Sequence, residues 1–202
     1  MIDPHTLINA QIHPHARAAQ SITWDSRLVN EHTAFVALQG ENAHGNDFVQ
    51  VALERGAPFV LSTLNVERGV QVSDARAALR SWARSRRDTH QGAVVGITGS
   101  AGKTTAKEYV GAALGAYFTS GNLNTLDAIA CFLLEHAGCT EPLVVEMGID
   151  RIGEMAQLMA LVAPDIGVIT AIGEAHLEFF GTLETIAKEK GGILSAPLLG
   201  LV

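Results

Sequence analysis

The segment 96–105 has the residue types of a loop that binds the phosphates of a nucleotide. Successive glycines let backbone N–H groups converge on one anion, and the N-terminus of a following helix adds a partial positive charge. Lys103 would then reach the outer phosphates, and the Thr104 hydroxyl would bind Mg²⁺. The strict spacing of a phosphate loop places a glycine where Ile97 stands, and Gly99 supplies the early glycine instead.

The context of this segment favours phosphate binding over the alternative, a simple glycine turn with an exposed lysine. The apolar run Ala93–Val95 precedes it and an Ala- and Leu-rich helical stretch follows, which is the strand, loop, helix order of a phosphate loop. We therefore predict that the chain binds ATP or a close relative. The residues expected to contact it are Gly99, Ser100, Ala101, Gly102, Lys103, Thr104 and Thr105.

Two further side chains that can bind metal ions stand at the ends of predicted strands. Glu146 closes the apolar run Leu143–Met147, and a carboxylate there commonly binds the Mg²⁺ beside a phosphate loop. The alternative is that it caps the turn that follows. His176 comes after the run Ile166–Ala171, where a metal or phosphate contact and a structural hydrogen bond are equally plausible.

Four other residues have types and spacing that suit either a site or a surface. Asn122 and Asn124 follow the helix after the phosphate loop, and their amides suit a turn and a substrate contact equally well. Lys188 and Lys190 lie in the predicted amphipathic helix Leu183–Lys190, where the pattern favours an exposed surface for both.

The elements that must position these side chains predict an α/β fold. A small N-terminal α/β domain, residues 1–85, is expected to be followed by a phosphate-loop-type ATPase domain with a parallel sheet, residues 86–202. Continuous Val/Ile/Leu runs are typical of strands buried in a parallel sheet. In such a sheet, ligands are expected to bind at the carboxyl ends of the strands. The predicted strands are Ala34–Leu38, Pro58–Leu61, Ala93–Thr98, Leu143–Met147 and Ile166–Ala171. The predicted helices are Phe48–Arg55, Ser73–His90, Lys103–Leu114, Leu126–His136, Gly153–Val162 and Leu183–Lys190.

Composition limits the class of protein. The chain has 202 residues, 48% of them hydrophobic and 17% charged, which is typical of a folded soluble protein. Its net charge of −7 argues against a protein that coats nucleic acid, and no apolar run is long enough to predict membrane insertion. Cys131 and Cys139 form no disulfide framework, so a reducing cytoplasm fits best. One arginine-rich stretch favours a solvated helix face: Arg76, Arg80, Arg84, Arg86 and Arg87.

Taken together, several motifs resemble the Mur ligase family. The motifs are the phosphate loop 98–105, Gly121–Asn124, Val145–Gly148 with Gly153–Glu154, and Ala175–Glu178 with Phe180–Gly181. Earlier in the chain, Asp25–Arg27, Phe35–Gly40 and Asn46–Phe48 are similar to the family's domain that binds a uridine nucleotide. The resemblance covers nearly the whole chain, and four motifs in the family's order are highly specific.

The resemblance implies an ATP-driven amide ligation in peptidoglycan synthesis. Within the family the motifs are most similar to the members that add D-alanyl-D-alanine to UDP-N-acetylmuramoyl-tripeptide through an acyl phosphate. Ser26 and Arg27 would contact the uridine end, and Asn122 and Asn124 would face the substrate. Lys103 would be catalytic, Thr104, Glu146 and His176 would bind Mg²⁺, and Lys190 matches a lysine that is carbamylated to serve the metal site.

The family pattern also sets expectations about length and leaves alternatives. Its central domain extends well beyond Lys190 and a third domain delivers the dipeptide, so the resemblance implies that the central domain is incomplete here and the dipeptide-binding domain is absent. The complete enzyme is expected to be a monomer. The alternative function is a catalytically silent nucleotide-binding remnant. A ligase for the third residue and a folylpolyglutamate synthase remain possible, although Gly153–Glu154 and His176–Glu178 argue against both.

Overall fold

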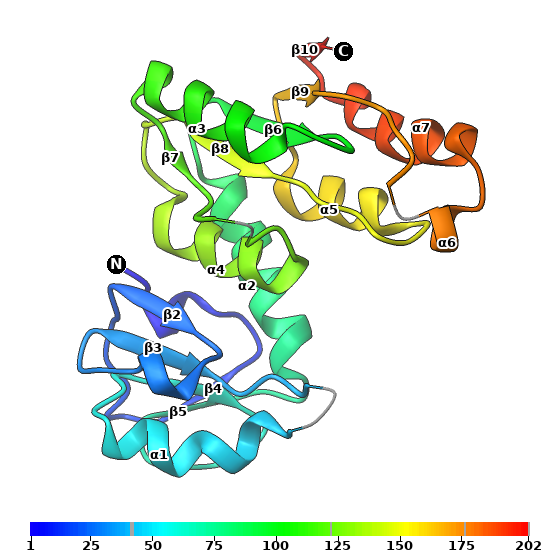
Figure 1. Cartoon of the computed structure of the whole chain (residues 1–202). Helices are drawn as coiled ribbons and strands as arrows, with labels where there is room; N and C mark the ends of the chain where they lie inside the picture. Colours follow the sequence, from blue (N-terminus) through cyan, green and yellow to red (C-terminus); the bar gives the residue numbers. More distant parts are fainter. Residues whose placement is uncertain (41–42, 122, 176, 202) are drawn as a thin grey trace. The chain divides into compact units, whose positions relative to one another are not determined.

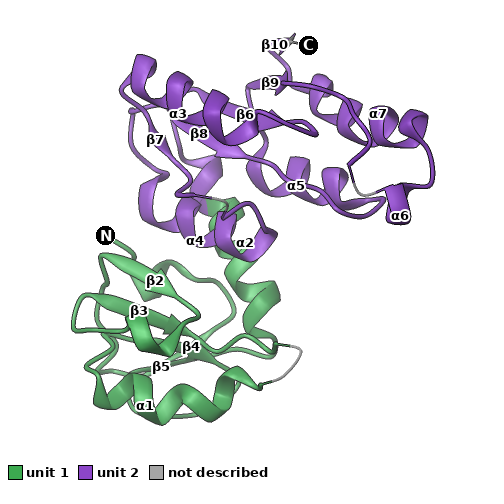
Figure 2. Ribbon diagram, viewed as in Figure 1, with its two compact units in different colours: residues 1–85 green, residues 86–202 purple. Residues whose placement is uncertain are grey.

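The computed structural model describes residues 1–40, 43–121, 123–175 and 177–201, which form two compact units, residues 1–85 and 86–202 (Figure 2). The α/β class predicted from the sequence is confirmed in both. What each unit binds stays a prediction. Among the described residues, no helix combines the length and the apolar character that crossing a bilayer requires.

The first unit is built on a five-stranded sheet in the order β1-β5-β4-β3-β2, parallel except for β1 against β5 (Figure 1). Its core forms because Phe35 of the wholly buried strand β3 and Ala37, just after it, pack against the apolar face of α1. Its strands are β1 Gln11–Ile12, β2 Ser21–Thr23, β3 Thr33–Val36, β4 Val60–Ser62 and β5 Gly69–Gln71, and its helix α1 is Val49–Glu54. Short 3₁₀ helices span Pro4–Thr6, Ser26–Leu28 and Gly45–Phe48.

The second unit carries a wholly parallel sheet in the order β10-β9-β6-β8-β7. Helix α2, Ala75–Asp88, leads into it from the first unit. Its strands are β6 Val94–Thr98, β7 Tyr117–Phe118, β8 Leu143–Glu146, β9 Ile166–Ile169 and β10 Leu199–Leu201. Its helices are α3 Lys103–Leu114, α4 Leu126–His136, α5 Glu154–Val162, α6 Leu177–Phe180 and α7 Leu183–Gly191, with a 3₁₀ turn at Gly192–Ser195.

Alternation along the central strand β6 decides which helix covers which face. Val95 and Ile97 pack with Val110 and Ala106 of α3, while a Cβ on the intervening Gly96 would meet Met147 and Ile193 on the other side. Figure 1 shows α3 on one face of the sheet and α4 and α5 on the other. Because the strands are parallel, the segments that follow β6, β8 and β9 meet at one edge.

The interpretation of the arginine-rich stretch as a solvated face is wrong for Arg87, which is 8% exposed. Its Nε donates to Val162 O at 2.9 Å, and its Nη2 donates to Ala163 O at 2.8 Å and to Asp165 Oδ2 at 3.2 Å. The last carbonyls of a helix have no intrahelical donor, and the guanidinium supplies one to the end of α5. Arg87 is therefore part of the interior of the second unit.

Candidate active site

The loop after β6 is shaped by glycine and by the segment after β9. Gly99 has φ +153, and a Cβ there would overlap Thr170 Oγ1, so only glycine fits. Ser100 N donates to Ala171 O at 2.8 Å, and Ser100 Oγ donates to Gly173 O at 2.9 Å. The loop that the sequence singled out is thus held against the neighbouring strand end.

The same loop ends in the first turn of α3. Gly102 has φ +79, the left-handed region that favours glycine, and the helix begins at Lys103. The amides of Lys103, Thr104 and Thr105 belong to the first turn, whose N–H groups have no acceptor within a helix. Lys103 Nζ lies over the loop and donates to Gly99 O at 2.9 Å. An ammonium, a helix N-terminus and a run of amides therefore converge at one place, which suits an anion.

Glu146, at the carboxyl end of β8, faces this helix turn. It is 2% exposed, and its Oε2 accepts a hydrogen bond from Thr104 Oγ1 at 2.9 Å. Its Oε1 accepts one from Asn124 Nδ2 at 3.3 Å. The alternative role, capping the turn after β8, belongs to Glu154 instead, whose Oε2 accepts the Asp150 N–H at 2.7 Å. The structure therefore brings Thr104, Glu146 and Asn124 together.

Sequence reasoning assigned no role to Lys107, which joins the same group of side chains. It is wholly buried, its Nζ donates to Gly121 O at 2.5 Å, and it lies 3.4 Å from Glu146 Oε2. A signal was present, because residues four apart share one face of a helix, and Lys107 stands four residues after Lys103.

The expectation that Lys188 and Lys190 are both exposed is half wrong. Lys188 is exposed, whereas Lys190 is 2% exposed. Burial, together with the nearby Lys103 and against the opposing effect of Asp150, lowers the pKa of Lys190 to about 8. Since the amine is buried beside another cation, it has unusual access to its neutral form.

The side chains present can be compared with the needs of Mg²⁺, the ion that the resemblance in sequence implies. Mg²⁺ takes oxygen ligands, and the Thr104 hydroxyl and the Glu146 carboxylate are both of that kind. An unmodified Lys190 offers no oxygen. His176, predicted as a ligand, lies outside the described residues, and so does Asn122. Among the described residues no cluster of three or more His, Cys, Asp or Glu side chains could hold a metal ion.

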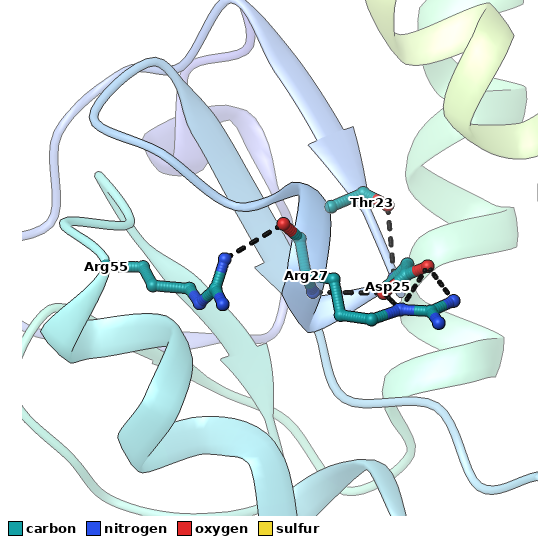
Figure 3. Close-up of polar contacts among 4 residues, drawn as sticks. All are labelled: Thr23, Asp25, Arg27 and Arg55. Atoms are coloured by element: carbon teal, nitrogen blue, oxygen red, sulfur yellow. Dashed lines mark hydrogen bonds and ion pairs between the residues drawn. The ribbon is translucent and has the colours of Figure 1, made fainter.

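The first unit contains the two remaining predicted contacts, Ser26 and Arg27, in the 3₁₀ helix Ser26–Leu28. Figure 3 shows Arg27 with its partners Asp25 and Arg55. Asp25 is the N-cap of the 3₁₀ helix that carries them, and its carboxylate binds the Arg27 guanidinium, with Arg27 Nη2 2.6 Å from Asp25 Oδ2. Hydrogen bonds from the side chain and the backbone N–H of Arg27 are the main reasons why the pKa of Asp25 is lowered to about 2. Arg55 Nη1 donates to Arg27 O at 2.9 Å. Arg27 is exposed and Ser26 is half-buried, so both can be reached from solvent.

A cavity of about 440 Å³ lies at the carboxyl ends of β3, β4 and β5 in the same unit. This volume is within the range of small-molecule sites. Ser26 and Arg27 do not line it. Its polar lining residues are Gln39, His44, Asn46, Thr63, Ser73, Asp74, Arg76 and Arg80.

Comparison with known proteins gives a consistent answer for both units. Residues 97–198 match the model of the Mur ligase middle domain, and residues 19–87 match that of the Mur ligase family catalytic domain. The chain is 35% identical over 184 residues to a UDP-N-acetylmuramoyl-tripeptide–D-alanyl-D-alanine ligase of Bacillus subtilis, covering 86% of this chain and 40% of that protein. For the Escherichia coli ligase of the same name the identity is 32%, covering 94% and 43%.

Solved structures agree. The chain superimposes on MurF from Acinetobacter baumannii with a TM-score of 0.79 at 31% identity, covering 89% of this chain and 42% of that one. For MurF ligase from Thermotoga maritima in complex with ADP the TM-score is 0.78 at 34% identity, covering 90% and 45%. The chain thus spans less than half the length of the relatives that it matches.

Proposed function

The chain belongs to the Mur ligase family, and from this premise we propose that it binds Mg²⁺-ATP and UDP-N-acetylmuramoyl-tripeptide for an amide ligation. In the proposed reaction the terminal carboxylate of the peptide takes the γ-phosphoryl group while ADP leaves. The amine of D-alanyl-D-alanine then displaces phosphate from the acyl phosphate and forms the amide. The two cysteines and the use of ATP favour a cytoplasmic location.

The observation that carries this proposal is the hydrogen bond between Thr104 Oγ1 and Glu146 Oε2, at 2.9 Å, beside the loop that ends in left-handed Gly102. It brings two oxygen atoms of the kind that binds Mg²⁺ to the start of a helix whose N-terminus would attract phosphate. Mg²⁺ bound there would reduce the repulsion between a triphosphate and the substrate carboxylate. Lys103 would contribute in the same way, because its ammonium would stabilise the charge that develops on phosphoryl transfer.

We propose further that Lys190 is carbamylated. Its neutral amine would attack carbon dioxide, forming an N–C bond and releasing a proton, and the product would offer the oxygen atoms that an amine lacks. Support comes from its burial beside Lys103. A carbamate carbon signal after loading with ¹³C-labelled bicarbonate, absent from Lys190→Gln, is expected. No signal in the wild type would exclude the modification.

The test of nucleotide binding is calorimetric titration with ADP and with a non-hydrolysable ATP analogue, with and without Mg²⁺. We expect Lys103→Ala to lower affinity about tenfold or more, because one charge-assisted contact to phosphate is lost. Thr104→Val should abolish the dependence on Mg²⁺ and leave a Mg²⁺-free affinity. Wild-type affinity in Lys103→Ala, with the same Mg²⁺ dependence, would refute the proposed site.

A second candidate function is a catalytically silent nucleotide-binding remnant, for which the loop that ends in Gly102 and the N-terminus of α3 would suffice. The two are separated by phosphate release measured with ATP, UDP-N-acetylmuramoyl-tripeptide and D-alanyl-D-alanine. Release that requires both acceptor substrates supports ligation, and nucleotide binding without release supports the remnant.

For the first unit we propose that it holds the uridine end of the substrate, with Ser26 and Arg27 as contacts. Support comes from their accessible positions. Ser26→Ala and Arg27→Ala should each weaken UDP binding in the same titration while leaving ADP binding at the second unit unchanged. The cavity offers an internal comparison, since Thr63→Val alters its lining and not the 3₁₀ helix. Loss of UDP binding only in Thr63→Val would move the site to the cavity.

A further inference from the structure

A buried lysine connects the proposed metal ligand to the segment that carries a proposed substrate contact. Lysine is almost never fully buried unless it is paired, and Lys107 is wholly buried. Its ammonium donates to Gly121 O at 2.5 Å and lies 3.4 Å from Glu146 Oε2. Two different parts of the chain therefore share one cation.

The segment 119–125, between β7 and α4, is tied to Glu146 at three of its described residues. Thr119 Oγ1 accepts the Glu146 N–H at 3.1 Å, and Asn124 Nδ2 donates to Glu146 Oε1 at 3.3 Å. The third tie runs through Lys107, which joins the Gly121 carbonyl to the same carboxylate. Thr119 and Asn124, near the two ends of the segment, thus form hydrogen bonds with Glu146 directly. Gly121, in the middle, is linked to Glu146 through the ammonium group of Lys107.

Side-chain packing contributes little at the middle of the segment. Gly121 has φ +50, and a Cβ there would meet none of the described atoms within 4 Å. Near its end the fit is close, because a Cβ at Gly148 would overlap the Asn124 amide. Among the described contacts, the hydrogen bond from Lys107 to Gly121 O is therefore the one that links the middle of the segment to Glu146.

We propose that Lys107 is a positioning residue, which holds the segment 119–125 against Glu146 and so fixes Asn124 relative to the phosphate loop. The part of this proposal that concerns substrate rests on the proposed function. The ammonium suits the role because it can donate three hydrogen bonds, to a carbonyl and a carboxylate together. A neutral apolar side chain of similar length would fill the same space and bond neither.

The experiment compares the wild type with Lys107→Met and Lys107→Arg, with Lys188→Met as the matched control at an exposed lysine of the same unit. Circular dichroism first establishes folding. Amide hydrogen exchange is then measured without ligand for the segment 119–125 and, separately, for α4 and β8. Affinities for Mg²⁺-free ADP and for UDP-N-acetylmuramoyl-tripeptide complete the set.

In Lys107→Met we expect amide exchange in the segment to accelerate about tenfold or more, with α4 and β8 unchanged. The reason is that loss of the hydrogen bond to Gly121 O makes local opening of the segment easier. Affinity for the tripeptide substrate should fall while that for Mg²⁺-free ADP is retained, since no described contact joins Lys107 to the phosphate loop itself. Lys107→Arg should restore part of the protection, and Lys188→Met should behave as the wild type.

Unchanged exchange in a folded Lys107→Met would overturn the proposal. So would acceleration spread equally over α4 and β8, or failure of both Lys107 variants to fold, since either result assigns the lysine a purely structural role. A wild type that binds neither ADP nor the tripeptide substrate would refute the proposed function instead. The exchange measurements need no ligand and would still decide on Lys107.

Discussion

Replacing Arg87 by methionine tests whether this buried charge, near the end of α2, raises the free energy of unfolding of the second unit. The guanidinium makes three hydrogen bonds, to Val162 O, Ala163 O and Asp165 Oδ2. Asp165 Oδ2 also accepts the Val94 N–H at 2.8 Å, so the group links the end of α5 to the start of β6. Methionine keeps much of the apolar stem and removes every donor.

The expected loss is worked from these contacts. Breaking a buried ion pair by removing one partner costs about 3 to 5 kcal/mol. The Asp165 side chain is 28% exposed and water can solvate it, so the lower end applies, about 3 kcal/mol. With a typical slope for urea unfolding, this moves the midpoint down by about 1 to 3 M. Arg87→Lys should recover only part, because lysine lacks the planar fork.

The chain contains its own probes for this assay. Both tryptophans, Trp24 and Trp82, belong to the first unit, and both tyrosines, Tyr109 and Tyr117, belong to the second. Tyr117 stacks on His136 with ring centroids 4.6 Å apart, so its emission should change when the second unit unfolds.

In urea titrations, Arg87→Met should lower the midpoint seen by tyrosine fluorescence much more than that seen by tryptophan. Arg151→Met, at an exposed arginine of the same unit, is the control and should change stability by less than about 1 kcal/mol. A tyrosine midpoint for Arg87→Met equal to that of the control would refute the reasoning.

Three further predictions address pH, the phosphate loop and the first unit. Burial and the neighbouring Arg87 lower the pKa of His90, so the unfolded state binds the proton more readily than the folded state. The free energy of unfolding should therefore fall as pH drops below about 6.5. In His90→Phe this loss of stability at acidic pH should be smaller, and a pH profile identical to that of the wild type would contradict the reasoning. Gly99→Ala should abolish ADP binding in calorimetry while the chain still folds, because a Cβ would displace the loop; retained affinity would show that the loop tolerates it. Trp82→Phe removes the hydrogen bond from Nε1 to Thr6 Oγ1 at 2.9 Å and should lower the free energy of unfolding of the first unit by about 1 kcal/mol. Unfolding is followed by circular dichroism, because the substitution removes a tryptophan probe. A variant as stable as the wild type, or more stable, would argue that the bond contributes nothing.

The long elements of the second unit could be predicted from the sequence because their signals are local. The helices Lys103–Leu114 and Leu126–His136 have the predicted bounds, since a glycine before the first and a Thr125 N-cap before the second mark where each begins. The buried strands β6 and β8 differ from prediction by one residue at one end. The two-residue strands β1 and β7 went unpredicted because so short a run shows no period.

The parts of the candidate site that could be predicted are those in which a residue's role follows from its position in a loop or at the end of a strand. Thr104 and Glu146 could be placed together from the sequence because Thr104 comes after one strand of a parallel sheet and Glu146 ends another. Lys107, Lys190 and Arg87 were not recognised as buried, since a charged side chain on a helix ordinarily faces solvent and its burial depends on partners distant in sequence. The tertiary partners, Gly121 O and Val162 O among them, become visible only in the fold.

The parallel arrangement of the second sheet separates the chain's turns into two sets with different tolerance to engineering. Segments after the carboxyl ends of the strands carry the proposed site, whereas the turns that enter the strands, such as 137–142 before β8, lie at the opposite edge of the sheet. Gly138, Thr140 and Glu141 are exposed there. A fluorescent reporter or an affinity tag inserted in that turn should therefore leave the proposed nucleotide site unchanged. Such a label could be used to follow ligand binding without altering the affinity.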